Sequence, residues 1–123
     1  GVQTYGVALS VDERTLYVAN NDRARPVWVA YPLLEGGALG AGRVLHDGSE
    51  WAARYRGLPD GLKVDRAGNL WCAGSEALYV FAADGTHLGS LRFGALTSNC
   101  AFDARGALYV TVDSALYRLA PGG

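Results

Sequence analysis

The residue with the clearest chemical potential in this sequence is Asp60, a single acid enclosed in Pro59-Asp60-Gly61. Proline fixes its own φ and glycine reaches backbone angles that other residues avoid, so this tripeptide holds a carboxylate in a defined turn. Such a carboxylate could serve a ligand site. Aspartate in a Pro-Asp-Gly sequence also forms ordinary turns by capping its own backbone, and the tripeptide alone leaves both interpretations open.

Residues from other parts of the chain occupy positions equivalent to Asp60. Asp60 comes just before an expected strand, and Tyr5 and Ser98, with Asn99 beside it, come just before two strands of the same pattern. If those strands lie side by side, their starts converge on one place, where Asp60 is the only acid among these residues. Ser98 and Asn99 are therefore candidates for contacts with a substrate or water, with hydrogen bonding at a strand start as the alternative.

Other chemistries find little support in the sequence. It contains no Gly-x-Ser-x-Gly motif, and neither His46 nor His87 has an evident nucleophile partner, so serine-type hydrolysis is not indicated. We expect both histidines on or beside outer strands, at the surface or an edge. Cys72 and Cys100 lie on apolar strands without Cys-x-x-Cys or Cys/His metal spacing, which predicts buried free thiols.

The elements that must position these residues are short strands. Glycines fall between runs of β-branched and aromatic residues, and no window keeps a helical apolar period for the roughly 10 to 12 residues that a helix needs. The expected strands cover residues 5–10, 15–20, 27–31, 42–46, 62–64, 70–73, 78–81, 87–93, 99–102, 107–111 and 115–119. Trp28, Tyr79 and Tyr117 recur on third strands, where packing between sheets explains them. The fold class is therefore all-β.

A repeat organises these strands. Four landmarks of the middle part of the chain recur near the C-terminus with a constant offset of 38 residues. They pair Gly61 with Asn99, Asp65 with Asp103, Leu70 with Leu108, and Leu78 with Leu116. The first part of the chain follows the same pattern with longer loops. A repeated four-stranded meander of about 40 residues is the signature of a β-propeller blade, whereas a β-sandwich would give irregular spacing.

The repeat predicts a single partial β-propeller domain over residues 1–123, with blades at roughly 1–50, 51–94 and 95–123. The last blade has three expected strands and lacks a fourth. Because propellers close with about four to eight blades, we interpret the chain as the C-terminal half of a propeller with about six, whose N-terminal half is missing. Exposed flanking blades and an unpaired edge at 115–119 predict association or poor solubility.

Composition limits the partners and the compartment. Eleven basic and twelve acidic residues are scattered singly, for a net charge of −1, so nothing favours nucleic acid or an anionic membrane. No apolar run approaches the roughly 18 residues of a membrane span, and the start has no basic segment followed by an apolar one. The absence of methionine indicates a processed or truncated chain, and the two lone cysteines favour a cytoplasmic protein. The expected partner is small or neutral.

The residues that form this repeat resemble a known family. The stretches that carry the resemblance are Gly6-Val7-Ala8-Leu9-Ser10-x-Asp12-x-x-x-Leu16-Tyr17-Val18, Pro59-Asp60-Gly61-Leu62-x-Val64-Asp65-x-x-Gly68-Asn69-Leu70-Trp71, Leu78-x-Val80-Phe81-x-x-x-Gly85-x-x-Leu88-Gly89, Asn99-Cys100-Ala101-Phe102 and Leu108-Tyr109-Val110-Thr111. Over nearly the whole chain they are similar to the C-terminal part of the SMP-30/gluconolactonase/LRE-like family.

This resemblance implies a six-bladed propeller that binds one divalent cation, calcium or zinc, at the channel mouth and hydrolyses sugar lactones or related esters. In that family the Asp of the Pro-Asp-Gly motif is a metal ligand and a proposed general base, which makes Asp60 the expected metal ligand and catalytic residue. A hard cation suits oxygen ligands, polarises a lactone carbonyl and acidifies a bound water. The other family ligands, a Glu and an Asn, belong to blades outside this chain, so the chain alone is expected to be inactive.

Tyr5 departs from the family pattern. An earlier blade of the family usually reads Pro-Asn-Gly, with the Asn as a further ligand, where this chain has Thr4-Tyr5-Gly6. A phenol with a pKa near 10 is a poor neutral ligand. Either the coordination differs, or the metal has been lost, or Tyr5 contacts the substrate. The leading hypothesis is a metal-dependent lactonase; the alternatives are a non-catalytic propeller that binds a ligand or protein, and an esterase or phosphotriesterase on the same scaffold.

Overall fold

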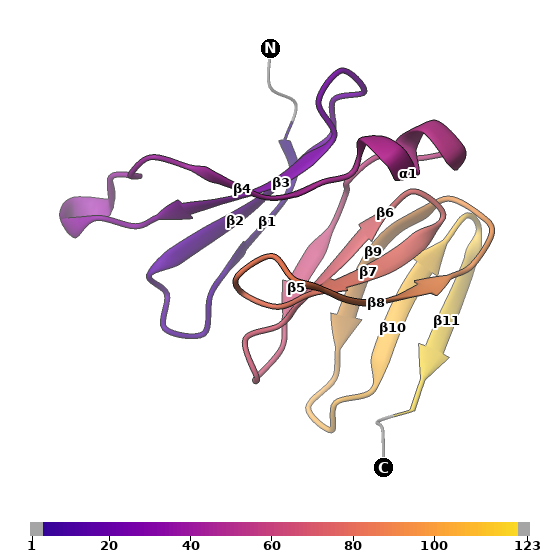
Figure 1. Cartoon of the computed structure of the whole chain (residues 1–123). Coiled ribbons are helices and arrows are strands. Elements are labelled where there is room, and N and C mark those ends of the chain that lie inside the picture. The colour runs from indigo at the N-terminus through magenta and orange to yellow at the C-terminus, as the bar shows by residue number, and fades with distance from the viewer. Residues whose placement is uncertain (1–3, 121–123) are drawn as a thin grey trace.

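Three antiparallel sheets follow one another along the chain in the computed structural model, which describes residues 4–120 (Figure 1). The first sheet contains β1 (Thr4–Leu9), β2 (Thr15–Asn20), β3 (Val27–Pro32) and β4 (Arg43–Asp47). The second contains β5 (Leu62–Val64), β6 (Leu70–Gly74), β7 (Ala77–Phe81) and β8 (His87–Arg92). The third contains β9 (Thr97–Phe102), β10 (Leu108–Val112) and β11 (Ala115–Leu119). Strands that are consecutive in sequence are hydrogen-bonded neighbours, so each sheet is a meander.

This arrangement confirms the predicted all-β class, and the helical elements are short additions to it. A 3-10 turn, η1 (Glu35–Gly37), lies between β3 and β4, and α1 (Ser49–Arg54) joins the first sheet to the second. The expectation of no helix was wrong for α1, because its six residues are too few to produce an apolar period. No helix within residues 4–120 is long and apolar enough to cross a membrane.

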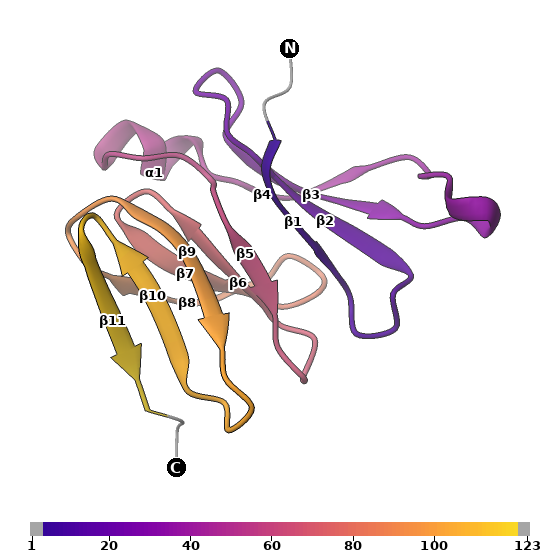
Figure 2. The same cartoon turned by 180° about the vertical axis from the view of Figure 1, so that it is seen from behind.

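The first strands of the three sheets, β1, β5 and β9, lie next to one another, and each sheet extends outward from them (Figure 2). Two glycines permit this close approach. A Cβ atom at Gly6 would collide with the carbonyl oxygen of Asp60, and a Cβ atom at Gly61 would collide with Asn99 Oδ1. The sheets are therefore arranged around a common line, as in a propeller, and are not stacked as the two facing layers of a sandwich.

Two apolar cores hold neighbouring sheets together. The core between the first and second sheets is largely aromatic: Trp28 of β3 is 2 % exposed, and Tyr79 and Phe81 of β7 are fully buried. The core between the second and third sheets is mainly aliphatic and includes the fully buried Leu78 and Val110. Trp28 and Tyr79 thus pack between sheets, as the sequence predicted.

Other side chains singled out by the sequence differ in their environment. Cys72 and Cys100 are buried free thiols, as predicted, and burial raises the pKa of Cys100 to about 11. His46 lies on the outer strand β4, as expected, but it is half-buried, because α1 places Trp51 over it with ring centroids 4.8 Å apart. Tyr117 was expected to pack between sheets but is 47 % exposed, because β11 ends its sheet.

The third sheet ends in an unpaired edge at β11. Four of the five residues of this strand are exposed, and Leu116 is 67 % exposed. A strand with free backbone donors and acceptors and apolar side chains is a template for pairing with a further strand. The third sheet therefore has one strand fewer than its two neighbours, as the repeat predicted.

Candidate functional site

Asp60 lies at the entry to β5 and is fixed by backbone contacts on two sides. Its N–H donates to the carbonyl oxygen of Ala73 on β6 at 2.9 Å. From the loop after β2, Asn21 Nδ2 donates to the carbonyl oxygen of Pro59 at 3.0 Å. Pro59 itself is fully buried. The turn that carries Asp60 is thus held between the first and second sheets.

The Asp60 carboxylate is half-buried and has no counter-ion among the described residues 4–120. Burial raises the pKa of Asp60 above its ordinary value, and the nearby backbone N–H of Gly61 only partly offsets that shift. The one ion pair within residues 4–120 joins Arg56 to Glu76, at 3.5 Å, and leaves Asp60 uncompensated. A half-buried carboxylate with a raised pKa is a frequent feature of functional sites, although structural carboxylates can show it too.

The predicted neighbours of Asp60 come from the two adjacent inner strands. The N–H of Gly61 donates to the carbonyl oxygen of Ser98 at 2.8 Å, which brings the start of β5 against β9. Ser98, expected just before this strand, lies within β9 together with Asn99, because β9 begins at Thr97. Tyr5 lies in β1, but its side chain falls outside the described part of the structure.

The side chains of Ser98 and Asn99 are exposed and have partners within the protein. Ser98 Oγ lies 2.8 Å from Thr111 Oγ1 of the neighbouring strand β10. Asn99 Oδ1 accepts from the N–H of Cys100 at 2.9 Å and from Lys63 Nζ at 3.3 Å. These contacts are the strand-start hydrogen bonds of the alternative interpretation, and they also orient both groups beside the entry to β5.

Two residues of this region were not identified from the sequence. Asn21 fixes the turn of Asp60 through its hydrogen bond to Pro59, which is 38 residues away along the chain. Lys63 places an ammonium group beside Asn99 from the neighbouring strand β5. Neither residue belongs to a motif, and only the docking of separate sheets brings them to the site. A sequence signal for Asn21 would have required knowing which loop lies over Pro59.

Among the described residues, the side chain that suits a metal ligand is that of Asp60. An oxygen-rich site of a hard cation needs several carboxylate, carbonyl or amide oxygens. Within residues 4–120 no group of three or more His, Cys, Asp and Glu side chains could hold a metal ion. The uncompensated carboxylate of Asp60 suits a cation, whereas Asn99 Oδ1 already accepts two hydrogen bonds. A complete site would need further oxygen donors beside Asp60.

Antiparallel meanders whose first strands meet along a common line define a protein of the β-propeller class. The sequence comparison is more specific, because the profile of the SMP-30/Gluconolactonase/LRE-like region matches residues 3–114. This chain belongs to the SMP-30/gluconolactonase/LRE-like family, as the sequence motifs predicted.

Relatives with sequences or structures similar to this chain include gluconolactonases. A gluconolactonase of Zymomonas mobilis is 37 % identical over 120 residues, which are 93 % of this chain and 33 % of that protein. The structure of a gluconolactonase of Xanthomonas campestris superposes with a TM-score of 0.81 at 33 % identity, over 94 % of this chain and 36 % of its own. The chain therefore spans about a third of the length of these relatives.

A third neighbour supports the fold alone. It is regucalcin of Agrobacterium tumefaciens, described as a calcium-binding protein, with a TM-score of 0.71 at 24 % identity over 88 % of this chain and 37 % of its own. Because these matched structures are propellers of which the chain covers a part, the three sheets correspond to consecutive blades.

Proposed function

We propose that this protein is a divalent-metal-dependent hydrolase of sugar lactones in which Asp60 is both a metal ligand and the general base. The observation that carries the proposal is the state of this one side chain. Its carboxylate is half-buried and has no counter-ion in the described part of the chain, its pKa is raised by burial, and it lies where the inner strands of three sheets begin. A cation would supply the missing charge. Membership of a family that includes gluconolactonases supports the reaction class.

The proposed reaction requires a group that accepts a proton from the attacking water. Lactone hydrolysis adds water to a carbonyl carbon, and a carboxylate near the attacking water can accept its proton. The raised pKa of Asp60 makes it a better proton acceptor than an ordinary aspartate. A bound calcium or zinc ion would supply Lewis-acid polarisation of the carbonyl oxygen.

The neighbours of Asp60 would bind and orient the lactone. Ser98 and Asn99 offer exposed hydroxyl and amide groups on β9, and we propose them, with Tyr5 of β1, as contacts to the hydroxyl groups of the sugar acid. Because the chain spans about a third of its relatives, we further propose that the remaining metal ligands come from blades beyond residues 1–123. The 123-residue chain alone is then inactive.

The test compares the full-length protein with its Asp60→Asn variant. Calorimetric titration with calcium and zinc ions, followed by gluconolactone hydrolysis in a pH-stat, should show binding and turnover in the parent and loss of both in the variant. An Asp113→Asn variant, which alters an exposed aspartate of the β10–β11 turn, should retain both. Unchanged hydrolysis in Asp60→Asn would disprove the assigned role.

Tyr5 favours one alternative function, which is that of a propeller that binds a ligand without turnover. The residue stands where the family pattern has a metal-ligating Asn. This function predicts that neither the parent nor Asp60→Asn binds a divalent ion. If an ion binds but gluconolactone is not cleaved, a panel of aryl esters and phosphotriesters would distinguish a different hydrolase from a lactonase.

A further inference from the structure

A cavity lies at the opposite end of the inner strands from Asp60. Its volume is about 540 Å³, within the range of about 300 to 1,000 Å³ that small-molecule sites have. The cavity lies between the second and third sheets, beside the β5–β6 and β9–β10 turns, so its lining begins at Val64 where β5 ends. It shares no lining residue with the region of Asp60, Ser98 and Asn99.

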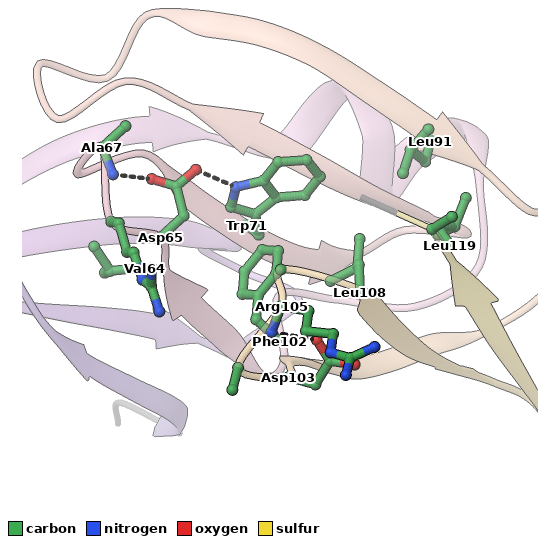
Figure 3. Close-up of a pocket in the computed structure, with 14 residues that line it drawn as sticks. Val64, Asp65, Ala67, Trp71, Leu91, Phe102, Asp103, Arg105, Leu108 and Leu119 are labelled. Carbon is green, nitrogen blue, oxygen red and sulfur yellow. Dashed lines mark hydrogen bonds between the residues drawn. The ribbon is translucent and has the colours of Figure 1, made fainter. Parts of the chain in front are cut away.

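The wall of this cavity is apolar and partly aromatic (Figure 3). The rings of Trp71 on β6 and Phe102 on β9 meet edge to face, with centroids 5.5 Å apart and planes at 85°. Leu91 and Leu119 continue the wall from the outer strands. All four side chains are only half-buried although they pack on the second core. They therefore leave apolar surface available to a ligand.

The two acids of the cavity are already occupied by internal hydrogen bonds. Asp65 Oδ1 accepts from the N–H groups of Ala67 and Asn69, both at 2.9 Å, and Asp65 Oδ2 accepts from Trp71 Nε1 at 2.9 Å. Asp103 repeats this arrangement in the next hairpin, where backbone N–H groups lower the pKa of its carboxyl group. Both carboxylates hold their turns together and have little capacity left for a ligand.

The arginines of the same two turns remain available. Arg66 and Arg105 line the cavity and are exposed, and within residues 4–120 neither guanidinium forms an ion pair or donates a hydrogen bond. The nearby Arg118 adds positive charge and is directed to Tyr109, whose hydroxyl oxygen accepts from Nε at 3.2 Å. The free hydrogen-bonding groups at the cavity entrance are thus cationic donors, while the acids beside them are satisfied.

We propose that this cavity binds a small organic anion with an apolar body, such as an aromatic carboxylate or sulfonate. The apolar body lies against Trp71 and Phe102, and the acid group accepts hydrogen bonds from Arg66 and Arg105. Guanidinium groups suit carboxylates and sulfonates because they offer paired donors in a plane. This inference does not depend on the proposed lactonase activity, since the cavity and Asp60 lie at opposite ends of the inner strands.

The test uses the full-length protein and the fluorescent probe 1-anilinonaphthalene-8-sulfonate. The Arg66→Gln/Arg105→Gln double variant should bind the probe about tenfold more weakly than the parent, since hydrogen bonds between ionised partners are stronger than those between neutral groups. A matched Arg23→Gln/Arg54→Gln variant removes two exposed arginines outside the cavity and should bind like the parent. All these arginines are exposed, so folding should be unaffected.

A neutral probe and the Asp60→Asn variant serve as the remaining controls. N-phenyl-1-naphthylamine, which lacks the sulfonate, should bind the parent weakly and should not distinguish it from the Arg66→Gln/Arg105→Gln protein. Asp60→Asn should bind the sulfonate probe like the parent, which separates this site from the proposed catalytic one. The proposal is overturned if the cavity double variant binds the sulfonate as tightly as the parent, if the neutral probe binds equally well, or if the full-length protein does not bind the sulfonate.

Discussion

Three aspartates in turns show how environment divides one residue type into two roles. Asp65 and Asp103 each accept backbone hydrogen bonds inside a hairpin turn, and those bonds lower the pKa of Asp103. Asp60 is half-buried, and burial raises its pKa. Ionised Asp103 therefore stabilises the fold, whereas ionised Asp60 costs stability.

We therefore expect Asp60→Asn to stabilise the protein when no metal is present. The pKa of Asp60 in the folded state lies above its unfolded value of 3.8, so its protonated form favours folding at acidic pH. That contribution is lost as pH rises through the folded-state pKa, and at pH 7 the buried charge is a net cost. In EDTA at pH 7, thermal unfolding should show a Tm a few degrees above that of the parent.

The control for this prediction is Asp113→Asn, which should leave Tm within about 1 °C because surface substitutions have small effects. Added calcium or zinc should reverse the order of the parent and Asp60→Asn, since an ion that binds only the folded parent stabilises it by mass action. A lower Tm for Asp60→Asn in EDTA would mean that its carboxylate has a stabilising partner.

For single residues, the sequence predicted the place of a side chain in the local backbone better than its contacts with other parts of the chain. Asp60 was identified because Pro-Asp-Gly restricts the local backbone, which is a property of adjacent residues. Asn21 and Lys63 were missed because their contacts depend on how sheets dock. The partial burial of His46 was missed for the same reason, since only the folded chain brings Trp51 over it.

At the element scale, the approach of the inner strands depends on glycine at two positions. We expect Gly6→Ala to destabilise the protein by about 1–3 kcal/mol, because the new methyl group would collide with the backbone of Asp60. Urea unfolding of the full-length protein would measure this change. Gly89→Ala, on β8, is the matched control: its new Cβ would meet no atom within 4 Å, so stability should be unchanged or slightly higher.

The junction of α1 with the first two sheets should respond to pH. The imidazole of His46 stacks on Trp51 and on Phe81, with centroids 4.8 and 4.9 Å apart, and its pKa is lowered by burial and by nearby His87, while Asp47 opposes the shift. As the pH is lowered through about 6.5, His46 takes up a proton in the unfolded chain while it is still neutral in the folded chain. The free energy of unfolding therefore decreases as the pH decreases, until the folded-state pKa is reached.

Replacing His46 with phenylalanine should therefore weaken the pH dependence of stability. Between pH 7.5 and 5 we expect the Tm of His46→Phe to fall less than that of the parent, because the ring remains and the titrating group is gone. His87→Gln should retain most of the parent's dependence, because burial is the larger cause of the shift. Equal slopes for the parent and His46→Phe would exclude His46 as the source.

The existence of the strands was largely predictable, but their first and last residues were less so. Runs of β-branched and aromatic residues between glycines located the eleven strands of residues 4–120, because strand propensity and turn chemistry are local. β9 begins at Thr97, two residues before the expected 99, because pairing with β10 extends it past a register shift. α1 was missed because a helix of six residues is held mainly by tertiary contacts.

At the scale of the whole molecule, the exposed edge at β11 leads to a prediction about association. We expect the 123-residue chain to self-associate as its concentration rises, because Leu116 is 67 % exposed on an unpaired strand. Leu116→Lys should shift the mass measured by light scattering toward the monomer. Leu39→Lys changes a leucine that is 48 % exposed in a loop and should have little effect. A monomeric parent at all concentrations would contradict the expectation.

The number of sheets and their order could be predicted because a constant offset of 38 residues records a repeated structure. The cavity between the second and third sheets could not be predicted, since its arginines and aromatic rings come from strands and turns of two different repeats. Repetition reveals what the blades share, whereas sites between blades depend on where they differ.

The three tryptophans are divided between the two seams that join the sheets. Trp28 and Trp51 belong to the first seam, where Trp51 stacks on Tyr79 with centroids 3.8 Å apart. Trp71 meets Phe102 across the second. Replacing Trp71 with phenylalanine would leave all indole emission in the first seam, so fluorescence spectroscopy of this variant would follow the loosening of that seam alone.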